Sequence, residues 1–389
     1  MAKKYLLFSF FFCLNIALIF LFKLNYFIFE KYTSFIWIPD FIFFVYLLKE
    51  NFKKKEIKLF LKVFFVFFLF KLIGSVSIFN QYSNIKLFIL DIIRTPLNYF
   101  FPVLLYLSFR DLKKIDLKNI FNCYKIILYL VLFTIIIGFL FSITVFKTYH
   151  GDRFGYSGIL FWSSFASYFT IINLLILFFY NKKIENVHNL LLISFIVAFL
   201  VGTKAVYLFL GVFALYYFID SRLYKSKNSY IFLSVLFLVF FIFKTQLSYY
   251  FSKTFKSLID LYNNNDLQTF IFSYRNLKFD NILDFTSKNW SFVNYLIGGV
   301  NRKEMLAELS LFDFILNFGV IGLASYLLLL LYFIKKEITL KTSKFIFIIF
   351  FLITALAGNF FNNTVIAYPL VLLLILISRK KEVVTQKNI

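Results

Sequence analysis

Long apolar segments separated by short basic connectors dominate this chain and limit what it can fold into. A helix needs about 20 apolar residues to cross the hydrocarbon core of a bilayer, and 61% of the residues are hydrophobic. About twelve candidate segments cover 5–22, 32–48, 59–79, 87–109, 120–146, 159–180, 190–201, 205–220, 230–247, 311–334, 345–358 and 364–378. Because backbone polar groups must be satisfied inside the membrane, the sequence predicts an all-α polytopic integral membrane protein, with about twelve transmembrane helices in a single domain over 1–389.

Basic residues are concentrated in alternate connectors. The formal net charge is +23, and Lys and Arg occur in short runs such as 49–58, 110–118 and 335–344. The short connectors on the other side carry few cations, namely Lys23, Lys31, Lys86, Lys147, Arg153 and Lys204. Cytoplasmic connectors hold the excess of basic residues in membrane proteins. The asymmetry therefore predicts that both termini are cytoplasmic, and it argues against nucleic acid as a partner.

Two loops on the outer side carry the polar residues that a bilayer would exclude. The larger covers 248–310, between the predicted ninth and tenth helices, and mixes both charge signs with turn formers and aromatic residues. Within it, 296–300 reads as a hydrophobic turn that re-enters the fold. The smaller loop covers 147–158 and contains Arg153 among several glycines, which would let its backbone approach an anion closely. Soluble-phase chemistry is expected at these loops, above a scaffold of helices.

Arginine is scarce in this chain, so the positions that keep it are informative. Lys is the default cation, whereas the planar guanidinium of Arg can bind an anion through two hydrogen bonds. Arg94, Arg153, Arg275 and Arg302 fall on the outer side or within the membrane. Arg94 stands three residues after Asp91, which suits an ion pair within one helix. It is either half of such a pair or a ligand contact.

Two helical hairpins are too short to cross the membrane fully. The segment 190–201 spans about 18 Å at 1.5 Å per residue, against a hydrocarbon core of about 30 Å. Its tip, 202–204, ends in Lys204, and the polar tip 358–364 follows the same pattern. Recessed polar tips predict a hydrophilic cavity that opens outward beneath the larger loop.

Three carboxylates cluster before the tenth predicted helix. Glu304, Glu308 and Asp313 could complement the helix dipole, and for Glu304 this alternative has equal weight. Asp313 already enters an apolar run, where an idle charge would be costly, so Glu308 and Asp313 are the predicted catalytic residues. The predicted ligands of a pyrophosphate are Arg153, Lys204, Arg275 and Arg94, through charge-assisted hydrogen bonds. No acidic pair with metal-ligand spacing occurs on this side, so no metal and no cofactor is expected.

Four patches, in this order, resemble the superfamily of O-antigen polymerases (Wzy) and O-antigen ligases. They are Arg153-Phe154-Gly155-Tyr156-Ser157-Gly158, Val201-Gly202-Thr203-Lys204-Ala205, the run from Gly298-Gly299 through Glu308-Leu309-Ser310-Leu311-Phe312-Asp313 to Phe318-Gly319-Val320-Ile321-Gly322, and Gly358-Asn359. The third patch is the most specific and resembles the polymerase form of the signature. Many relatives have Gly-His where this chain has Gly358-Asn359, and the first half of the chain matches only in topology.

The resemblance implies a GT-C-like membrane glycosyltransferase at the periplasmic face of a bacterial inner membrane. Such an enzyme transfers a growing glycan from undecaprenyl pyrophosphate to a sugar hydroxyl of another lipid-linked repeat unit, during synthesis of O-antigen or a related surface polysaccharide. The implied partners are the lipid-linked donor and acceptor and the lipid bilayer, with a chain-length regulator protein as a further candidate. Ligases of the superfamily place a His in the large loop, and 246–311 contains none, which favours a polymerase.

Two other classes of protein stay open from the sequence. A flippase for lipid-linked oligosaccharides also needs about a dozen helices and a cationic cavity, but such proteins generally have two related halves, and no repeat is visible here. A structural or assembly protein is disfavoured by the charges within the apolar segments.

Overall fold

All regular elements in the described part of the chain are helices. The computed structural model describes residues 2–29, 37–82, 84–149, 153–220, 225, 248, 252, 255–264, 266–301, 305–338, 341–356, 358, 360 and 363–378. The α-helices are α1 (Ala2–Phe29), α2 (Trp37–Asn51), α3 (Lys55–Val76), α4 (Ile85–Phe109), α5 (Lys114–Leu140), α6 (Ser163–Lys183), α7 (His188–Ala198), α8 (Lys204–Asp220), α11 (Lys256–Asn264), α12 (Leu267–Phe272), α13 (Arg275–Asn289), α14 (Phe292–Ile297), α15 (Ser310–Glu337), α16 (Lys341–Leu356) and α17 (Thr364–Ser378). Short 3₁₀ helices are η1 (Phe79–Gln81), η2 (Thr144–Phe146) and η3 (Phe199–Val201). Across these residues, β structure is limited to the isolated bridges Lys147–Tyr156 and Leu309–Gly358.

Six of the described helices, α1, α3, α4, α5, α6 and α15, are long and apolar enough to cross a membrane. This confirms the prediction of a helical, multi-pass membrane protein. Helices α2, α7, α8, α16 and α17 occupy further predicted segments but have only 11 to 17 residues. The segment 230–247 lies outside the described residues. The number of about twelve spans therefore stays a prediction.

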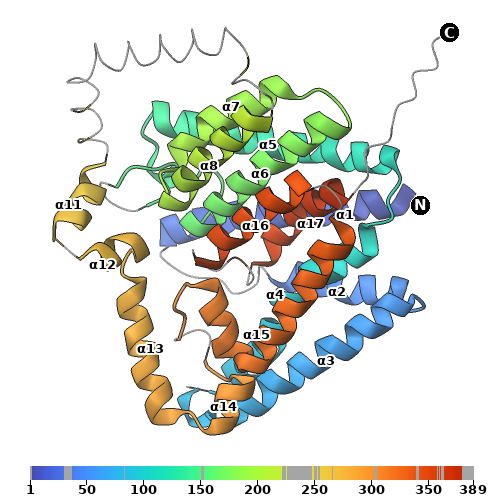
Figure 1. Ribbon diagram of the computed structural model, residues 1–389, viewed down its shortest axis with the longest axis vertical. Helices are drawn as coiled ribbons and strands as arrows, with labels where there is room; N and C mark the ends of the chain where they lie inside the picture. The colour runs from blue at the N-terminus through green and yellow to red at the C-terminus, as the bar shows by residue number, and fades with distance from the viewer. Residues whose placement is uncertain are drawn as a thin grey trace.

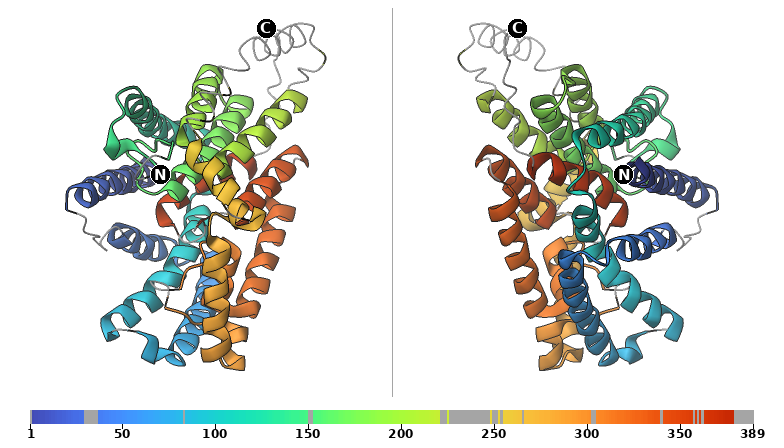
Figure 2. Two further views of the ribbon diagram at one scale, coloured as in Figure 1. Left: turned by 90° about the vertical axis from the view of Figure 1, so that its left-hand side faces the viewer. Right: turned by 90° about the vertical axis from the view of Figure 1, so that its right-hand side faces the viewer.

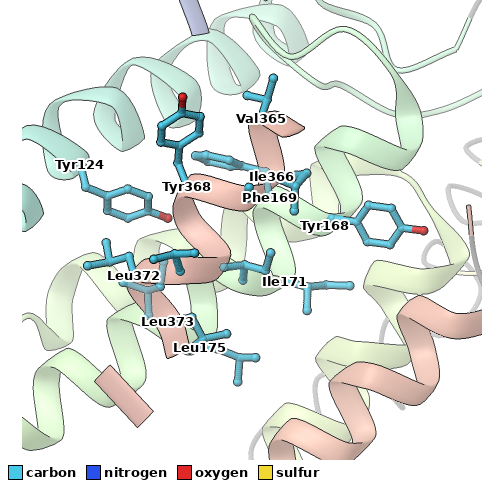
Figure 3. Close-up of a cluster of buried hydrophobic side chains, with 14 of the residues drawn as sticks. Tyr124, Tyr168, Phe169, Ile171, Leu175, Val365, Ile366, Tyr368, Leu372 and Leu373 are labelled. Atoms are coloured by element: carbon cyan, nitrogen blue, oxygen red, sulfur yellow. The ribbon is translucent and has the colours of Figure 1, made fainter. Parts of the chain in front are cut away.

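Helices α6 and α17 form the centre of the bundle. In α6, 89% of the apolar segment is buried inside the protein, as expected of a helix that is hydrophobic on all sides. Figure 3 shows Phe169 and Leu175 of α6 in one cluster with Ile366 and Leu373 of α17. This packing fixes the first turns of α6 against the chain that precedes α17.

Helices α11, α12 and α13 lie along one side of the bundle, and the N-terminus lies on the opposite side (Figure 1). When that side faces the viewer, α12 and α13 lie in front of the bundle (Figure 2, left). These helices belong to the predicted loop 248–310, so the described part of that loop is folded into helices. Arg275 is the first residue of α13, and its position is therefore set by regular structure.

Helix α14 enters the bundle between α3 and α15, at a break in α15. Gly319 has φ 67° and ψ −175°, which are not helical values. A Cβ added to Gly319 would lie 2.2 Å from the backbone of Leu296, and one added to Gly299 would lie 2.2 Å from the backbone of Gly74. Glycine is therefore required on both sides of the turn. The predicted re-entry at 296–300 is confirmed, while the predicted tenth span is broken at Gly319.

A buried ion pair joins α3 to α4 beside this turn. The Nζ of Lys71 lies 2.9 Å from the Oδ2 of Asp91, and the Lys71 side chain is fully buried. Lys71 also donates to the carbonyl of Val300 at 2.7 Å and to Asn317 Oδ1 at 2.9 Å. The hydroxyl of Tyr82 donates to Asp91 at 2.9 Å. Hydrogen bonds to all of these groups offset the cost of removing two charges from water.

Candidate functional site

The two described ends of the smaller loop pair with each other and are fixed to the first hairpin tip. The Thr148 amide donates to the Gly155 carbonyl at 2.9 Å, and the Tyr156 amide donates to the Leu200 carbonyl at 2.7 Å. The hydroxyl of Thr148 donates to the Val201 carbonyl at 3.0 Å. The smaller loop and the tip therefore form one rigid unit.

Lys23 of α1 fixes the same loop from the other side. Its Nζ donates to Ser157 Oγ at 2.8 Å, to the Gly158 carbonyl at 2.7 Å and to the Leu160 carbonyl at 2.8 Å. The side chain is buried, and three acceptors match the three donors of an ammonium group. The loop that carries Arg153 is thus held in one position by a residue far away in the sequence.

The glycines of this loop serve its own packing. A Cβ on Gly155 would lie 2.6 Å from the Val201 carbonyl oxygen, and one on Gly158 would lie 2.3 Å from Thr134 Oγ1. We predicted that these glycines let the backbone approach a ligand. The structure instead uses both to bring the loop close to neighbouring parts of the protein, and Gly151 lies outside the described residues.

Arg153 stacks on the ring of Tyr149, with 3.7 Å between its Cζ and the ring centroid. Burial raises the pKa of Tyr149, while the charges of Arg153 and Arg275 act against that rise. Among the described residues, the Nε of Arg153 is buried without a hydrogen-bond partner. Stacking fixes the plane of the guanidinium. Its N–H groups can then donate to an acceptor that lies in that plane.

Lys204 begins α8 at the first hairpin tip. Its Nζ donates to the Phe270 carbonyl of α12 and lies 4.1 Å from the centroid of the Phe270 ring. Burial lowers the pKa of Lys204 to about 8, and the nearby charges of Arg153 and Arg275 lower it further. The effect of Arg153 and Arg275 on Lys204 indicates that these three cations lie near one another, while their role as ligands of a pyrophosphate stays a prediction.

Arg275 and Glu308 meet at the start of α13. The Nε of Arg275 lies 3.6 Å from Glu308 Oε2, and Lys278 Nζ lies 2.6 Å from Glu308 Oε1. Tyr274 precedes α13 in a left-handed conformation, and Glu308 is left-handed as well, with φ 57°. A non-glycine residue in this region costs about 1–3 kcal/mol and is found most often at functional sites.

Asp313 is placed differently from Glu308. It lies in the first turn of α15 with 1% of its surface exposed, and its Oδ1 accepts a hydrogen bond from the Ala307 amide at 2.9 Å. It therefore supports the chain segment that carries Glu308. Its predicted catalytic role stays a prediction. Glu304 and Arg302 lie outside the described residues.

Arg94 is not linked to this group of cations by the contacts that can be described. It lies on α4, and the charge on which it acts is that of Asp40 in α2. Asp40 is buried and accepts hydrogen bonds from Asn15, Thr364 and Tyr368. The predicted contact between Arg94 and a ligand stays open.

The second hairpin tip packs against the first turns of α6. Gly358 forms a bridge with Leu309, and its carbonyl accepts a hydrogen bond from Ser310 Oγ at 2.6 Å. A Cβ on Gly358 would lie 2.6 Å from the hydroxyl oxygen of Tyr168. At the first tip, Thr203 Oγ1 lies 2.7 Å from Ser167 Oγ. Both polar tips thus meet α6, while their recessed position in the membrane stays a prediction.

Four helix N-termini therefore converge, those of α6, α8, α13 and α15. Their positive dipole ends add to the charges of Arg153, Lys204 and Arg275, while Glu308 supplies a single exposed carboxylate. Within the described residues no group of three or more His, Cys, Asp or Glu side chains could hold a metal ion. The arrangement favours binding of an anion with several acceptor oxygens.

The predicted outward cavity stays a prediction. One cavity in the described part of the protein lies between α5, α6 and α7. Its lining is mostly apolar, with Thr170, Asn173 and Ser194 as the polar members. It is therefore separate from the group of cations.

Sequence reasoning missed Lys23, Lys278, Tyr149 and Tyr168. Lys23 and Lys278 are two lysines in a Lys-rich chain, and the sequence contains 26 tyrosines, so residue type carried no signal. Of these contacts, only the stacking of Arg153 on Tyr149 joins two residues of the same loop. The other contacts join parts of the chain that are far apart in sequence.

Comparison with known proteins adds no relative. No family model, curated protein or solved structure matches this chain. The resemblance to O-antigen polymerases rests on the four sequence patches alone. The function must therefore be argued from the residues of the site.

Proposed function

We propose that this protein is a membrane glycosyltransferase of the O-antigen polymerase type, acting at the periplasmic face of a bacterial inner membrane with both termini in the cytoplasm. Its donor is a glycan on undecaprenyl pyrophosphate, and its acceptor is a sugar hydroxyl of another lipid-linked repeat unit. The observation that carries this proposal is the gathering of Arg153, Lys204 and Arg275 from three distant parts of the chain beside Glu308.

In the proposed reaction, the acceptor oxygen forms a bond to the anomeric carbon of the donor sugar. The bond between that carbon and the diphosphate oxygen breaks, and undecaprenyl pyrophosphate leaves with the electron pair. Glu308 accepts the proton of the attacking hydroxyl. The three cations stabilise the negative charge that develops on the leaving group, and they do so from positions fixed before the substrate binds.

The decisive experiment supplies purified protein with a lipid-linked repeat unit and no nucleotide sugar. A ladder of longer lipid-linked glycans supports the proposal. Transfer to a different lipid acceptor would indicate a ligase, and movement of the substrate across liposomes without new glycosidic bonds would indicate a flippase. Either of those outcomes contradicts the proposal.

Variants of the arginines test the assigned roles. Arg153→Ala and Arg275→Ala should abolish long chains while the protein still inserts into membranes, because each removes charge from the diphosphate site. Arg153→Lys should keep only part of the activity. An ammonium group can neither stack flat on a ring nor bind an anion through two parallel hydrogen bonds, as a guanidinium does. Unchanged chain lengths in the alanine variants would contradict the assignment of these residues to the diphosphate.

A further inference from the structure

Tyr168 is a buried tyrosine whose hydroxyl forms no well-shaped hydrogen bond with any described residue. Its side chain is 1% exposed, and the oxygen makes no hydrogen bond within the described part of the protein. The Ser310 hydroxyl lies close enough to the Tyr168 hydroxyl to interact with it, but the two do not meet hydrogen-bond geometry. The Ser310 hydroxyl already donates to Gly358 and accepts from the Phe360 amide at 3.1 Å. Burying a hydroxyl without a partner costs about 1–3 kcal/mol, so an unpaired phenol in the most tightly packed helix needs an explanation.

The phenol faces the group of charges and not the apolar core. Figure 3 shows that Tyr168 directs its hydroxyl away from Ile171 and the other labelled side chains. Electrostatic interactions link Tyr168 to Arg275, Glu308 and Asp313. The oxygen also lies against Gly358 at the second hairpin tip. The hydroxyl is thus directed at the place where we locate the diphosphate.

Tyr124 is a buried tyrosine of the same bundle whose hydroxyl is hydrogen-bonded within the fold, and it serves as a comparison for Tyr168. It is equally buried, with 1% of its surface exposed. Its hydroxyl donates to Asn173 Oδ1 at 3.1 Å, so its polar group is satisfied by the fold itself. The contrast indicates that the hydroxyl of Tyr168 is kept for a partner that does not belong to the fold.

We infer that Tyr168 is a further ligand-binding residue, which donates a hydrogen bond to a diphosphate oxygen held by Arg275. The inference rests on the proposed function and extends it with a neutral donor among the cations. A bond from a neutral donor to a charged acceptor fixes the orientation of the diphosphate more strictly than charge alone.

The test uses the full-length protein in detergent, with farnesyl pyrophosphate as the probe and sulfate at equal ionic strength as the control. Four proteins are compared, the unaltered chain, Tyr168→Phe, Tyr124→Phe and Arg275→Ala. Binding is measured as the rise in thermal unfolding temperature with probe concentration. The unfolding temperature without probe is recorded for each protein.

Tyr168→Phe should bind the probe roughly tenfold or more weakly, since a hydrogen bond to a charged group is lost. Without probe it should unfold at the same or a higher temperature, because the unpaired hydroxyl is gone. Tyr124→Phe should show the reverse, with lower stability and unchanged binding. If Tyr168→Phe binds as tightly as the unaltered chain, or is destabilised as Tyr124→Phe is, the inference is wrong.

The same measurements distinguish failure of the proposed diphosphate site from failure of the role assigned to Tyr168. Probe binding that is lost in Arg275→Ala but kept in Tyr168→Phe would support the diphosphate site and overturn only the role of Tyr168. Absence of probe binding by the unaltered chain, or equal stabilisation by sulfate, would overturn the diphosphate site itself and with it the inference.

Discussion

Two carboxylates stand near the start of α15, and their surroundings differ. Glu308 is partly exposed and touches Arg275 and Lys278. Asp313 is buried and bonded to the Ala307 amide. A proton acceptor must reach the substrate, so the geometry favours Glu308 over Asp313 as the base. Arg275 contacts Glu308 and is also assigned to the proposed diphosphate site, so donor binding would be coupled to release of the carboxylate.

Glu308→Gln should keep probe binding within a few-fold and lower the rate of glycan transfer by about 10²–10⁴-fold, as expected for loss of a general base. Asp313→Asn is the matched control, because its amide oxygen can still accept the bond from Ala307. It should retain most of the transfer rate in the same assay. Full activity of Glu308→Gln would assign the base to Asp313 or remove it from the mechanism.

Lys204 is expected to make the proposed glycan transfer dependent on pH. Its folded-state pKa of about 8 lies below the ordinary value of 10.5, so the positive charge is lost as pH rises through about 8. We expect kcat/KM for the donor to fall between pH 7 and pH 9. In Lys204→Arg the guanidinium stays charged, and this alkaline fall should disappear. A profile that is identical in both proteins would contradict a role for the Lys204 charge.

At the scale of elements, hydropathy alone indicated most helices of the bundle but none of the contacts between them. The period and length of apolar segments report burial in lipid or protein, so α1, α3 and α6 could be predicted. The spacing of Asp91 and Arg94 suggested a local pair, which stays a prediction, and the structure gives Asp91 a further partner on α3, Lys71, that the spacing did not indicate. Such a partner depends on how helices pack, which one sequence does not reveal.

The break in α15 makes a prediction about stability. Gly319→Ala would force a Cβ to within 2.2 Å of the Leu296 backbone at a positive φ, so it should lower the thermal unfolding temperature and disturb α14. Gly211→Ala is the control, because a Cβ there meets nothing within 4 Å, and alanine favours the helix by about 0.5–1 kcal/mol. Equal unfolding temperatures for both variants would show that the packing of α14 does not depend on the break in α15 at Gly319.

At the scale of the whole molecule, the N-terminus lies on one side of the bundle and α11 to α13 lie on the opposite side (Figure 1). The basic connectors predict the orientation of the chain in the membrane, because charge asymmetry reports orientation, and that orientation stays a prediction. It could predict the residues of the candidate site only in part, since Tyr168 and Lys23 take their roles from neighbours far away in the chain.

Thiol labelling tests the orientation. In a background of Cys13→Ala and Cys123→Ala, a single cysteine at Asn289 should react with a membrane-impermeant maleimide in intact spheroplasts. A cysteine at Lys54 should react only after the membrane is opened. The reverse pattern would invert the topology and would place the cations on the cytoplasmic side.

The polar contacts of α17 bear on how the chain is made. Tyr368 donates to Asp40 and accepts from Asn15, so the last described helix satisfies a carboxylate near the start of the chain. During synthesis that carboxylate lacks its bonds from Thr364 and Tyr368 until α17 has been made. A stop codon ahead of α17 would thus leave a bundle in which Asp40 keeps the bond from Asn15 alone among these three, and such a partly satisfied acid is a feature that cellular quality control can recognise.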